Sequence, residues 1–377
     1  MKKIVIIGAS ELQNPLILKA KEMGLETHVF AWKDGSVGEE TADYFYPISI
    51  VEKEEILKVC RDIKPDAAAT IASDLANITV NYLAHNLGLT ANSERSILIS
   101  TNKFEMRNAF KSAGIPAPVF KKAGKDDNLE EIKKMRLPVI VKPTDRSGSR
   151  SITMIEDIND LESAVEQAIN DSFESKAIIE EYIEGNEYSC ECISFAGKHH
   201  FLAVTKKFTT GAPHFIETGH MEPSDLDEET VERVKVLISK ALDALEVRYG
   251  ASHSEFKVDN DGNINIIEIG SRMGGDCIGS DLVQLSTGYD FVKMVIQTAF
   301  GEEPTFEKVT VPKAAAVKYI FSKEDLKHFE NIKKNYPNAI YRYSNMDIKE
   351  TNVVDSSSRF GFYILSCDNI DTLNSII

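Results

Sequence analysis

The clearest chemical signal in the sequence is a hairpin that would bring two carboxylates together. Asp261 and Gly262 stand between two strand-like runs, and both residue types tolerate the positive φ of a tight turn. A two-residue turn here places Glu255 opposite Glu268 on antiparallel strands. Facing carboxylates repel each other unless a cation lies between them. Because hard cations take oxygen ligands and share them with phosphates, the pair predicts a Mg²⁺ site.

The same face of this hairpin carries further residues. With side chains alternating along a strand, His253, Gly270 and Arg272 join the two glutamates. Ile264 and Ile266 also fall on this face, which predicts that it is partly covered. A solvated face with an Arg–Glu pair is the alternative. A change of the turn by one residue would move the glutamates to opposite faces.

Two lysines and a loop of small residues could bind phosphates. Lys142 ends an apolar run, and Lys103 lies on a predicted helix. Residues 144–151 include one glycine, three serines, one threonine and two arginines. Such a loop offers N–H groups, hydroxyls and positive charge with little bulk, although a plain connection between strands is the alternative. The chain has no GxxxxGK[ST] sequence, which excludes a P-loop.

Residues 1–95 alternate short apolar runs with helical stretches, which predicts a parallel sheet with helical crossovers. Ligands of such sheets bind beyond the carboxyl ends of the strands. Ser73 and Asp74 follow one strand, so we expect them near a substrate, with capping of the next helix as the alternative. Gly8 begins no GxGxxG sequence, which argues against a dehydrogenase.

Composition narrows the classes of function. The 377 residues, 42% of them hydrophobic, suffice for about two or three domains. The net charge of −16 disfavours a nucleic-acid partner. A membrane-spanning helix needs an apolar run of about 18 residues, and no run in this sequence approaches that length. The five cysteines form no CxxC pair. We therefore expect a cytoplasmic protein with free thiols and no membrane association.

In their order along the chain, these features resemble the ATP-grasp superfamily of carboxylate-amine ligases, most closely the L-amino-acid ligase and carbamoyl-phosphate-synthetase-like members. The resemblance spans essentially the whole chain. It implies a mixed α/β and α+β fold: a Rossmann-like domain at 1–95, an ATP-grasp domain at 96–310 with a lid subdomain at about 115–183, and a small β-rich cap at 311–377. It further implies ATP and Mg²⁺ (or Mn²⁺) as cofactors, and a homodimer is common among such proteins.

The resemblance also implies roles for individual residues. The nucleotide would contact lysines, lid residues, an adenine-binding segment and a ribose-binding glutamate: Lys103, Lys142, Ser147, Gly148, Ser149, Glu180, Glu181, Tyr182, Ile183 and Glu187. The metal-binding pair of the family matches Glu255 and Glu268. The predicted catalytic residues are Arg272, which would hold an acyl phosphate, Lys142 and His253. The predicted substrate site comprises Ser73, Asp74, His220, Arg272, Gly274 and Gly275.

One position departs from the family pattern. The usual continuation after the second glutamate is Glu-x-Asn-x-Arg, but this chain has Gly270 where the asparagine would stand. Glycine has no side chain to bind a metal. Either Ser271, water or a third group compensates, or the second metal site is weak.

The predicted reaction joins a small carboxylate, an amino acid or similar, to an amine. The carboxylate attacks the γ-phosphate of ATP to give ADP and an acyl phosphate, which the amine converts to an amide and phosphate. The lid at 144–151 would exclude water from this intermediate. The alternatives are a bicarbonate-using carboxylase of the same superfamily and, from another class, a catalytically weak ATP-binding regulatory protein, which Gly270 would favour.

Overall fold

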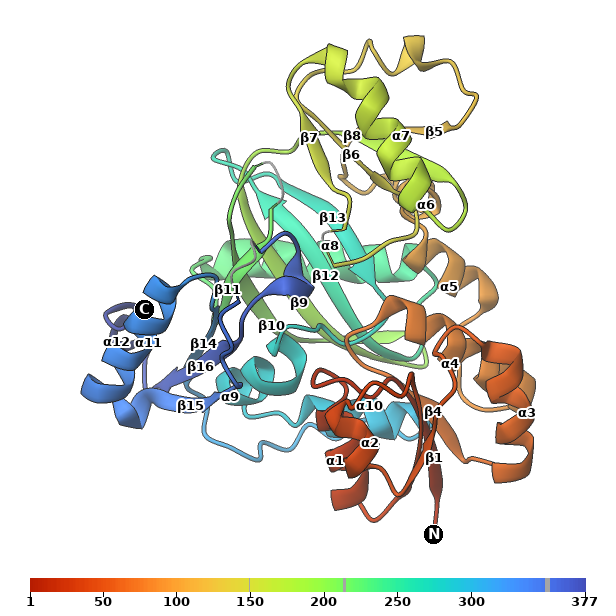
Figure 1. Ribbon diagram of the computed structural model, residues 1–377, viewed down its shortest axis with the longest axis vertical. Helices are drawn as coiled ribbons and strands as arrows, with labels where there is room; N and C mark the ends of the chain where they lie inside the picture. The colour runs from red at the N-terminus through yellow and green to blue at the C-terminus, as the bar shows by residue number, and fades with distance from the viewer. Residues whose placement is uncertain (149, 213–214, 350–352) are drawn as a thin grey trace.

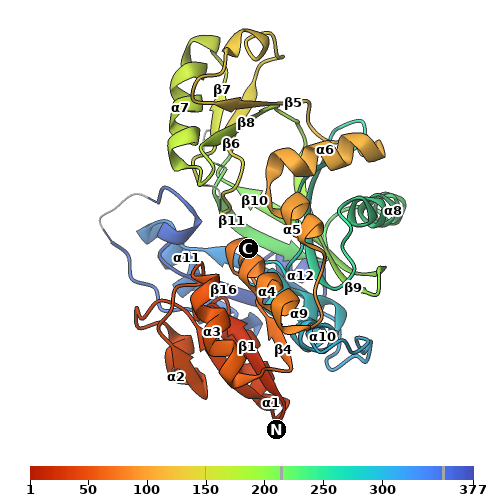
Figure 2. The ribbon, with the colours of Figure 1, turned by 90° about the vertical axis from the view of Figure 1, so that its right-hand side faces the viewer.

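Three β-sheets organise the chain in the computed structural model, which describes residues 1–148, 150–212, 215–349 and 353–377. Two sheets have four strands and the third has eight. Figures 1 and 2 show one four-stranded sheet at the top, the eight-stranded sheet below it and the N-terminal elements at the bottom. No helix within the described ranges is long and apolar enough to cross a membrane.

The N-terminal sheet is parallel, with the strand order β3-β2-β1-β4. Both of its faces are covered: Ile4 and Ile6 are buried on one side, and Val5 and Ile7 on the other. This burial explains why the strands read as continuous apolar runs. In chain order the elements are β1 (Lys3–Ile7), α1 (Asn14–Glu22), β2 (Glu26–Phe30), α2 (Val37–Thr41), β3 (Tyr44–Tyr46), α3 (Lys53–Ile63), β4 (Ala67–Ala69) and α4 (Asp74–Leu87).

The second four-stranded sheet, here called the lid sheet, is antiparallel, with the order β5-β8-β6-β7. One helix covers it with a buried stripe of Leu161, Ala164, Val165 and Ala168, spaced at the helical period. The elements are β5 (Phe120–Gly124), β6 (Val139–Pro143), β7 (Thr153–Ile155), α7 (Leu161–Asp171) and β8 (Lys176–Glu181).

The eight-stranded sheet, here called the large sheet, has the order β13-β12-β9-β10-β11-β14-β16-β15 and is antiparallel throughout. Its strands are β9 (Asn186–Phe195), β10 (Lys198–Thr209), β11 (Glu217–Glu222), β12 (Gly250–Val258), β13 (Ile264–Gly270), β14 (Ala314–Tyr319), β15 (Ile340–Tyr343) and β16 (Phe362–Cys367). The last three strands come from the predicted C-terminal cap but continue the same sheet. The predicted boundaries at residues 95 and 310 stay predictions.

Alternation along the large sheet separates a core face from a polar face. Cys190, Cys192 and Phe256 are buried with Ile238 and Leu242 of the helix beneath them, so these cysteines are packing residues. The opposite face carries the polar side chains described below. The remaining helices are α5 (Glu94–Thr101), α6 (Lys103–Ala113), α8 (Glu228–Ala244), α9 (Val283–Thr287), α10 (Phe291–Ala299), α11 (Lys323–Asn335) and α12 (Ile370–Asn374). Short helical turns are η1 (Leu129–Glu131), η2 (Ile158–Asp160), η3 (Ile278–Leu282), η4 (Pro337–Ala339) and η5 (Ser356–Ser358).

Candidate active site

The hairpin of β12 and β13 pairs Glu255 with Glu268, as the sequence predicts. The predicted two-residue turn is nevertheless wrong. The strands end at Val258 and resume at Ile264, so the turn spans residues 259–263. Its conformation is fixed by the Asp259 carboxylate, which accepts hydrogen bonds from backbone N–H groups inside the turn.

A β-bulge reconciles the longer turn with the predicted pairing. Phe256 pairs with Ile266, whereas its neighbour Glu255 pairs with Glu268, so Ile267 is an extra residue in β13. The bulge also reverses which side chains share a face. The predicted placement of Ile264 and Ile266 beside the glutamates is wrong, because both lie in the core beneath the sheet.

Each of the two glutamates has a lysine partner. Nζ of Lys103 lies 2.8 Å from Glu268 Oε1, and Lys207 forms an ion pair with Glu255. Lys207 also lies 3.3 Å from Glu187 Oε1. Burial favours the neutral amine, but the carboxylates of Glu255 and Glu187 outweigh it and raise the pKa of Lys207 well above its ordinary value. The sequence analysis did not single out Lys207, which stands within an otherwise unremarkable strand.

The glutamate pair fits a divalent cation that is shared with phosphates. Mg²⁺ is commonly held by one or two carboxylates together with phosphate oxygens and water. Glu255 and Glu268 supply two such carboxylates, and the ammonium groups beside them indicate that this position already stabilises positive charge. Among the described residues, no group of three or more His, Cys, Asp or Glu side chains forms a metal site by itself.

Lys142 lies in a buried charge cluster beneath the lid sheet. Its Nζ is 2.8 Å from Glu180 Oε2, and Nε of Arg107 is 2.6 Å from the other oxygen of that carboxylate. Burial raises the pKa of Glu180, but the charges of Arg107 and Lys142 outweigh it and leave the pKa below its usual value. Arg107 follows Lys103 by one helical turn and is only 1% exposed.

The predicted adenine-binding segment connects the lid sheet to the large sheet. The Glu181 amide donates to the carbonyl of Val119 at 2.9 Å. Nζ of Lys257 donates to the Ile183 carbonyl at 3.1 Å and lies 4.4 Å from the centre of the Tyr182 ring. The segment is therefore tied to both sheets, and its contact with adenine stays a prediction.

His253 is buried between two carboxylates. Its Nδ1 is hydrogen-bonded to Glu191, and its Nε2 lies 3.3 Å from Glu255 Oε1. Burial lowers the pKa of His253, but the two carboxylates outweigh burial and raise the pKa to about 9. Gly274 donates its N–H to Glu191 at 3.3 Å, and a Cβ at this position would lie 2.8 Å from His253 Nδ1. Only glycine permits this close approach.

Arg272 meets the N-terminal sheet domain. Its Nε lies 3.0 Å from Asp74 Oδ1, and its Nη2 donates to Oδ2 at 3.1 Å. Ser73 caps the same helix by accepting a hydrogen bond from the Ala76 amide at 3.2 Å, so the capping alternative is the observed one for this residue. Ser271 Oγ is bonded within the interior, to Ser100.

A second charged cluster lies farther along the large sheet. Nε2 of His220 is 3.6 Å from Asp276 Oδ2, and Arg359 donates to the same carboxylate from Nη1 and Nη2 at 2.9 and 2.7 Å. Burial lowers the pKa of His220, more than the nearby Asp276 raises it. The guanidinium of Arg359 also lies 3.6 Å from the centre of the Tyr319 ring. The sequence analysis singled out neither Asp276, which lies in a glycine-rich loop, nor Arg359.

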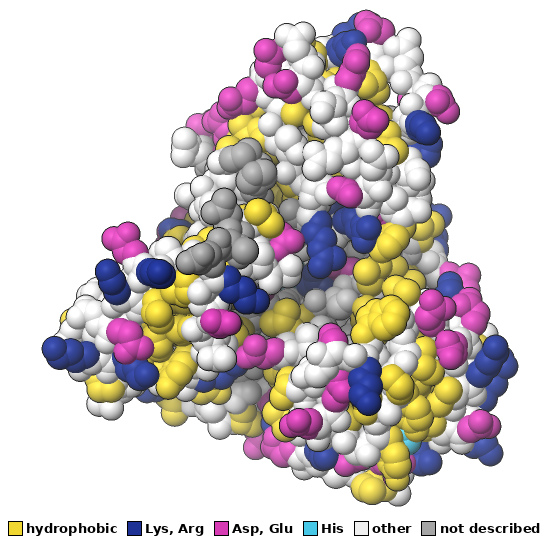
Figure 3. All heavy atoms as spheres, viewed as in Figure 1, with side chains coloured by type: hydrophobic (Ala, Val, Ile, Leu, Met, Phe, Trp, Pro, Cys, Tyr) yellow, Lys and Arg dark blue, Asp and Glu magenta, His cyan; other side chains and the backbone are white. Residues whose placement is uncertain are grey.

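Two neighbouring cavities open among these residues. The smaller, of about 80 Å³, is lined by Lys103, Lys142 and Glu268. The larger, of about 410 Å³, extends toward Ser73 and His220. Figure 3 shows Lys and Arg side chains beside acidic ones around a hollow below the lid sheet. The residues that line both cavities are Ser147, Gly148, Arg150, Glu217, His253, Glu255 and Arg272.

Most of the predicted site residues line these cavities, including Asp74 and Gly275. Other predicted residues pack behind the lining or lie at the connection between the sheets: Glu180, Glu181, Tyr182, Ile183, Glu187 and Gly274. Ser149 lies outside the described residues.

Residues 135–280 match the family model described as the ATP-grasp domain. This chain carries an ATP-grasp domain. The predicted ATP-grasp resemblance is thus confirmed. The match begins within the lid sheet, shortly before β6, and ends after the loop that contains Arg272, so it includes all the residues named as lining the smaller cavity except Lys103.

Relatives of the ATP-grasp domain include named ligases. The alanine–anticapsin ligase of Bacillus subtilis is 27% identical over 59% of this chain and 51% of its own length. The D-alanine–D-alanine ligase of Phocaeicola vulgatus is 27% identical over 48% of this chain and 59% of its own. The chain therefore spans little more than half the length of these curated relatives.

Solved structures confirm the predicted fold class. The L-amino acid ligase from Bacillus licheniformis superposes with a TM-score of 0.83 and 23% identity, covering 100% of this chain and 95% of that one. A biotin carboxylase domain from Hydrogenobacter thermophilus gives a TM-score of 0.78 with 20% identity, covering 100% and 89%. The ATP-grasp fold thus accounts for the parallel N-terminal sheet, the lid sheet and the large sheet together.

Proposed function

We propose that this protein is an ATP-dependent ligase that joins a small carboxylate to an amine through an acyl phosphate and releases ADP and phosphate. The observation that carries the proposal is the junction of the two cavities at Glu255, His253 and Arg272. A nucleotide in the smaller cavity would present its terminal phosphate to a carboxylate in the larger one. The ligase names of two relatives support the same reaction class.

The smaller cavity is the proposed site of the ATP phosphates. Lys103 and Lys142 would contact them, and the lid residues Ser147 and Gly148 would cover them with N–H and hydroxyl donors. Glu255 and Glu268 would hold Mg²⁺ or Mn²⁺, which when bound neutralises phosphate charge. The adenine and ribose would lie at the segment of residues 180–187.

Arg272 is the proposed stabiliser of the transferred phosphoryl group. A buried guanidinium acts on developing negative charge more strongly than an exposed one, because water does not screen it. Its side chain is 14% exposed and lines both cavities. Closure of the lid over the same junction would keep water from the acyl phosphate.

The larger cavity is the proposed substrate site. Its volume of about 410 Å³ suits small molecules such as amino acids. Arg150 and Arg272 would bind carboxylate groups, whereas Asp276 would bind an ammonium group. His220 borders the same space and would contact the amine.

The direct test measures ADP release with amino acids supplied singly and in pairs. We expect release that depends on both a carboxylate and an amine, and a loss of about 100-fold or more in Glu268→Ala, because charge stabilisation at the phosphates disappears. Glu302→Gln, in an exposed surface ion pair with Lys2, serves as the control. Undiminished release by Glu268→Ala would refute the assignment. ADP release that bicarbonate stimulates without an amine would indicate a carboxylase. ATP binding without any turnover would indicate a regulatory protein.

A further inference from the structure

The reacting-centre arginine is held by a residue from outside the ATP-grasp match. Asp74 is the first residue of α4, in the N-terminal sheet domain, and Arg272 follows β13. The two side chains meet through both carboxylate oxygens, at 3.0 and 3.1 Å. They are only 15% and 14% exposed, so the pair lies largely out of water. The contact of Nη2 with Oδ2 is a hydrogen bond, whereas the contact of Nε with Oδ1 is an ion pair without hydrogen-bond geometry; together they hold the guanidinium in place.

The missing side chain at residue 270 makes room for this pair. A Cβ on Gly270 would lie 2.9 Å from Asp74 Oδ1 and 3.2 and 3.3 Å from Cζ and Nε of Arg272. Gly270 is the last residue of strand β13 and is not among the residues with positive φ, so its backbone does not itself demand glycine. The neighbouring ion pair is what limits the space for a side chain at this position.

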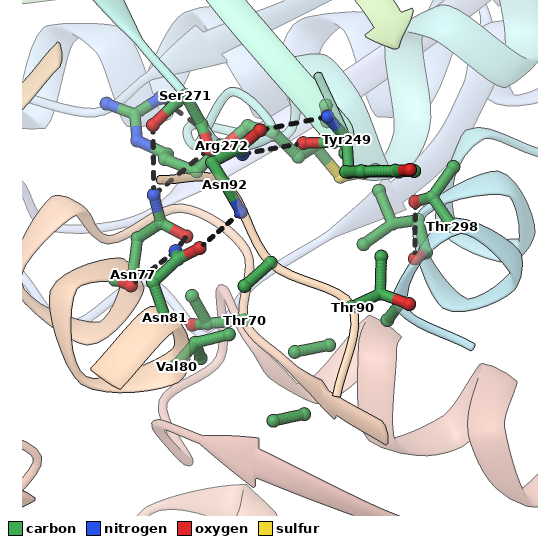
Figure 4. A pocket seen from close by; sticks show the side chains of 18 residues that line it. Thr70, Asn77, Val80, Asn81, Thr90, Asn92, Tyr249, Ser271, Arg272 and Thr298 are labelled. Carbon is green, nitrogen blue, oxygen red and sulfur yellow. Dashed lines mark hydrogen bonds between the residues drawn. The ribbon is translucent and has the colours of Figure 1, made fainter. Parts of the chain in front are cut away.

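Helix α4 holds the backbone of the same loop. Asn77, one turn after Asp74, donates from Nδ2 to the carbonyl and the hydroxyl of Ser271 at 3.0 and 3.1 Å. Figure 4 shows Asn77 directed at Ser271, with Arg272 beside it. The Ser271 hydroxyl is also bonded to Ser100 at 2.8 Å. The loop is thus anchored on one side of Arg272 while Asp74 holds its side chain.

We infer that Asp74 is a positioning residue that fixes the Arg272 guanidinium at the junction of the two cavities, and that Gly270 is the matching position that accommodates it. Asp74 therefore acts through Arg272, and the predicted direct contact of Asp74 with substrate is not needed. The inference rests on the proposed function, because it assumes that Arg272 acts on the transferred phosphoryl group. Through Asp74, the N-terminal sheet domain would help to orient Arg272 for the chemical step.

The first experiment compares Asp74→Asn with a matched control in the ADP-release assay. We expect Asp74→Asn to lower kcat by about 100-fold, the size of effect that follows when a reacting group is misplaced by about 1 Å. The KM for ATP and the thermal midpoint should stay near the parent values, because the nucleotide contacts and the core are untouched. The control is Asp290→Asn, which loses a comparable ion pair to Lys19 at 2.9 Å; neither residue lines either cavity. Asp290 also caps α10, and asparagine caps equally well.

The second experiment is a double-mutant cycle between positions 74 and 270. Gly270→Ala alone should lower kcat, because the new methyl group displaces Asp74 and Arg272. In Asp74→Ala the carboxylate is absent and the Arg272 side chain is free to move away from the new methyl group, so adding Gly270→Ala should cause little further loss. Should Asp74→Ala fail to fold, Asp74→Ser gives the same cycle.

The outcomes separate this inference from the proposed function. An active parent whose Asp74→Asn variant retains kcat would overturn the inference alone. The inference would also fail if the loss of kcat in the double variant equalled the product of the losses in the Asp74 and Gly270 single variants. Parallel falls in kcat, ATP affinity and thermal midpoint would also overturn it, since they indicate a purely structural residue. A parent enzyme inactive with every substrate pair would overturn both.

Discussion

Glu222 is a buried carboxyl group that forms no ion pair with a Lys or Arg side chain in the part of the chain that the structure describes. It is fully buried at the end of β11 and is hydrogen-bonded by Thr205 Oγ1 at 2.7 Å and by Ser286 Oγ at 2.6 Å. Burial raises its pKa from the ordinary 4.5 to about 8, although the two hydroxyl groups act in the opposite direction. The folded protein therefore keeps this group protonated at pH values where the unfolded chain has lost the proton.

A dependence of stability on pH follows from this carboxyl group. Because the folded pKa is the higher one, its contribution to stability is complete below about pH 4.5 and is lost as the pH rises through about 8. The loss is on the order of a few kcal/mol, at about 1.4 kcal/mol per pKa unit. Glu222→Gln should abolish this pH-dependent loss of stability, because glutamine does not titrate. The variant should therefore be more stable than the parent at about pH 9 but not at about pH 4.

Urea unfolding of Glu222→Gln and the parent at both pH values checks this prediction. The exposed Glu302→Gln variant is the control for loss of a carboxylate. An equal difference between Glu222→Gln and the parent at both pH values would contradict the raised pKa.

At the scale of elements, the hairpin shows what local sequence can predict. The pairing of Glu255 with Glu268 was predicted by counting from a two-residue turn, and it holds because the longer turn and the bulge at Ile267 offset each other. The turn and the bulge at Ile267 were missed, since an inserted residue leaves no compositional mark. The charged partners Lys207 and Arg107 were missed for another reason: their neighbours in space come from other segments of the chain.

The lid loop is the element that nucleotide binding should change most. Arg150 is exposed and lines both cavities. A nucleotide in the smaller cavity would engage this loop and limit its access to a protease. We expect a non-hydrolysable ATP analogue with Mg²⁺ to slow cleavage by trypsin after Arg150 by about 10-fold, because proteolysis tracks the accessible population.

Mass spectrometry of the tryptic fragments over time measures this protection. Cleavage after Lys125, which is exposed elsewhere in the lid subdomain, should keep its rate. Equal slowing at both sites would indicate a general effect of the nucleotide on stability, and no slowing would argue against a nucleotide under the lid.

Across the whole molecule, the larger cavity joins parts of the chain that are far apart in sequence. The N-terminal sheet domain supplies Ser73 and Asp74, the large sheet supplies His220, and the C-terminal segment supplies Arg359. The order of motifs along the chain predicted the fold class, because each motif belongs to one segment. Arg359 could not be predicted in the same way, since its partner Asp276 lies 83 residues away in the sequence.

Arg359 offers a test of whether the C-terminal segment shapes the substrate site. Its ion pair with Asp276 borders the larger cavity, whereas the ion pair of Arg342 with Asp281, at 2.6 Å, comes from the same C-terminal region but lines neither cavity. Arg359→Met should lower the free energy of unfolding by about 3 kcal/mol, because it leaves the largely buried Asp276 carboxylate without its arginine partner. It should also raise the KM for the carboxylate or amine about tenfold while the KM for ATP stays unchanged, a loss of about 1.4 kcal/mol in binding.

Steady-state kinetics and urea unfolding of Arg359→Met and Arg342→Met separate the two effects. Arg342→Met should be destabilised too, by less because Arg342 is more exposed, and should keep the substrate KM of the parent. An increase in KM in both variants would mean that loss of stability alone loosens the site. An increase confined to Arg359→Met would place the C-terminal segment within the substrate site, because only that ion pair borders the space in which the substrates would bind.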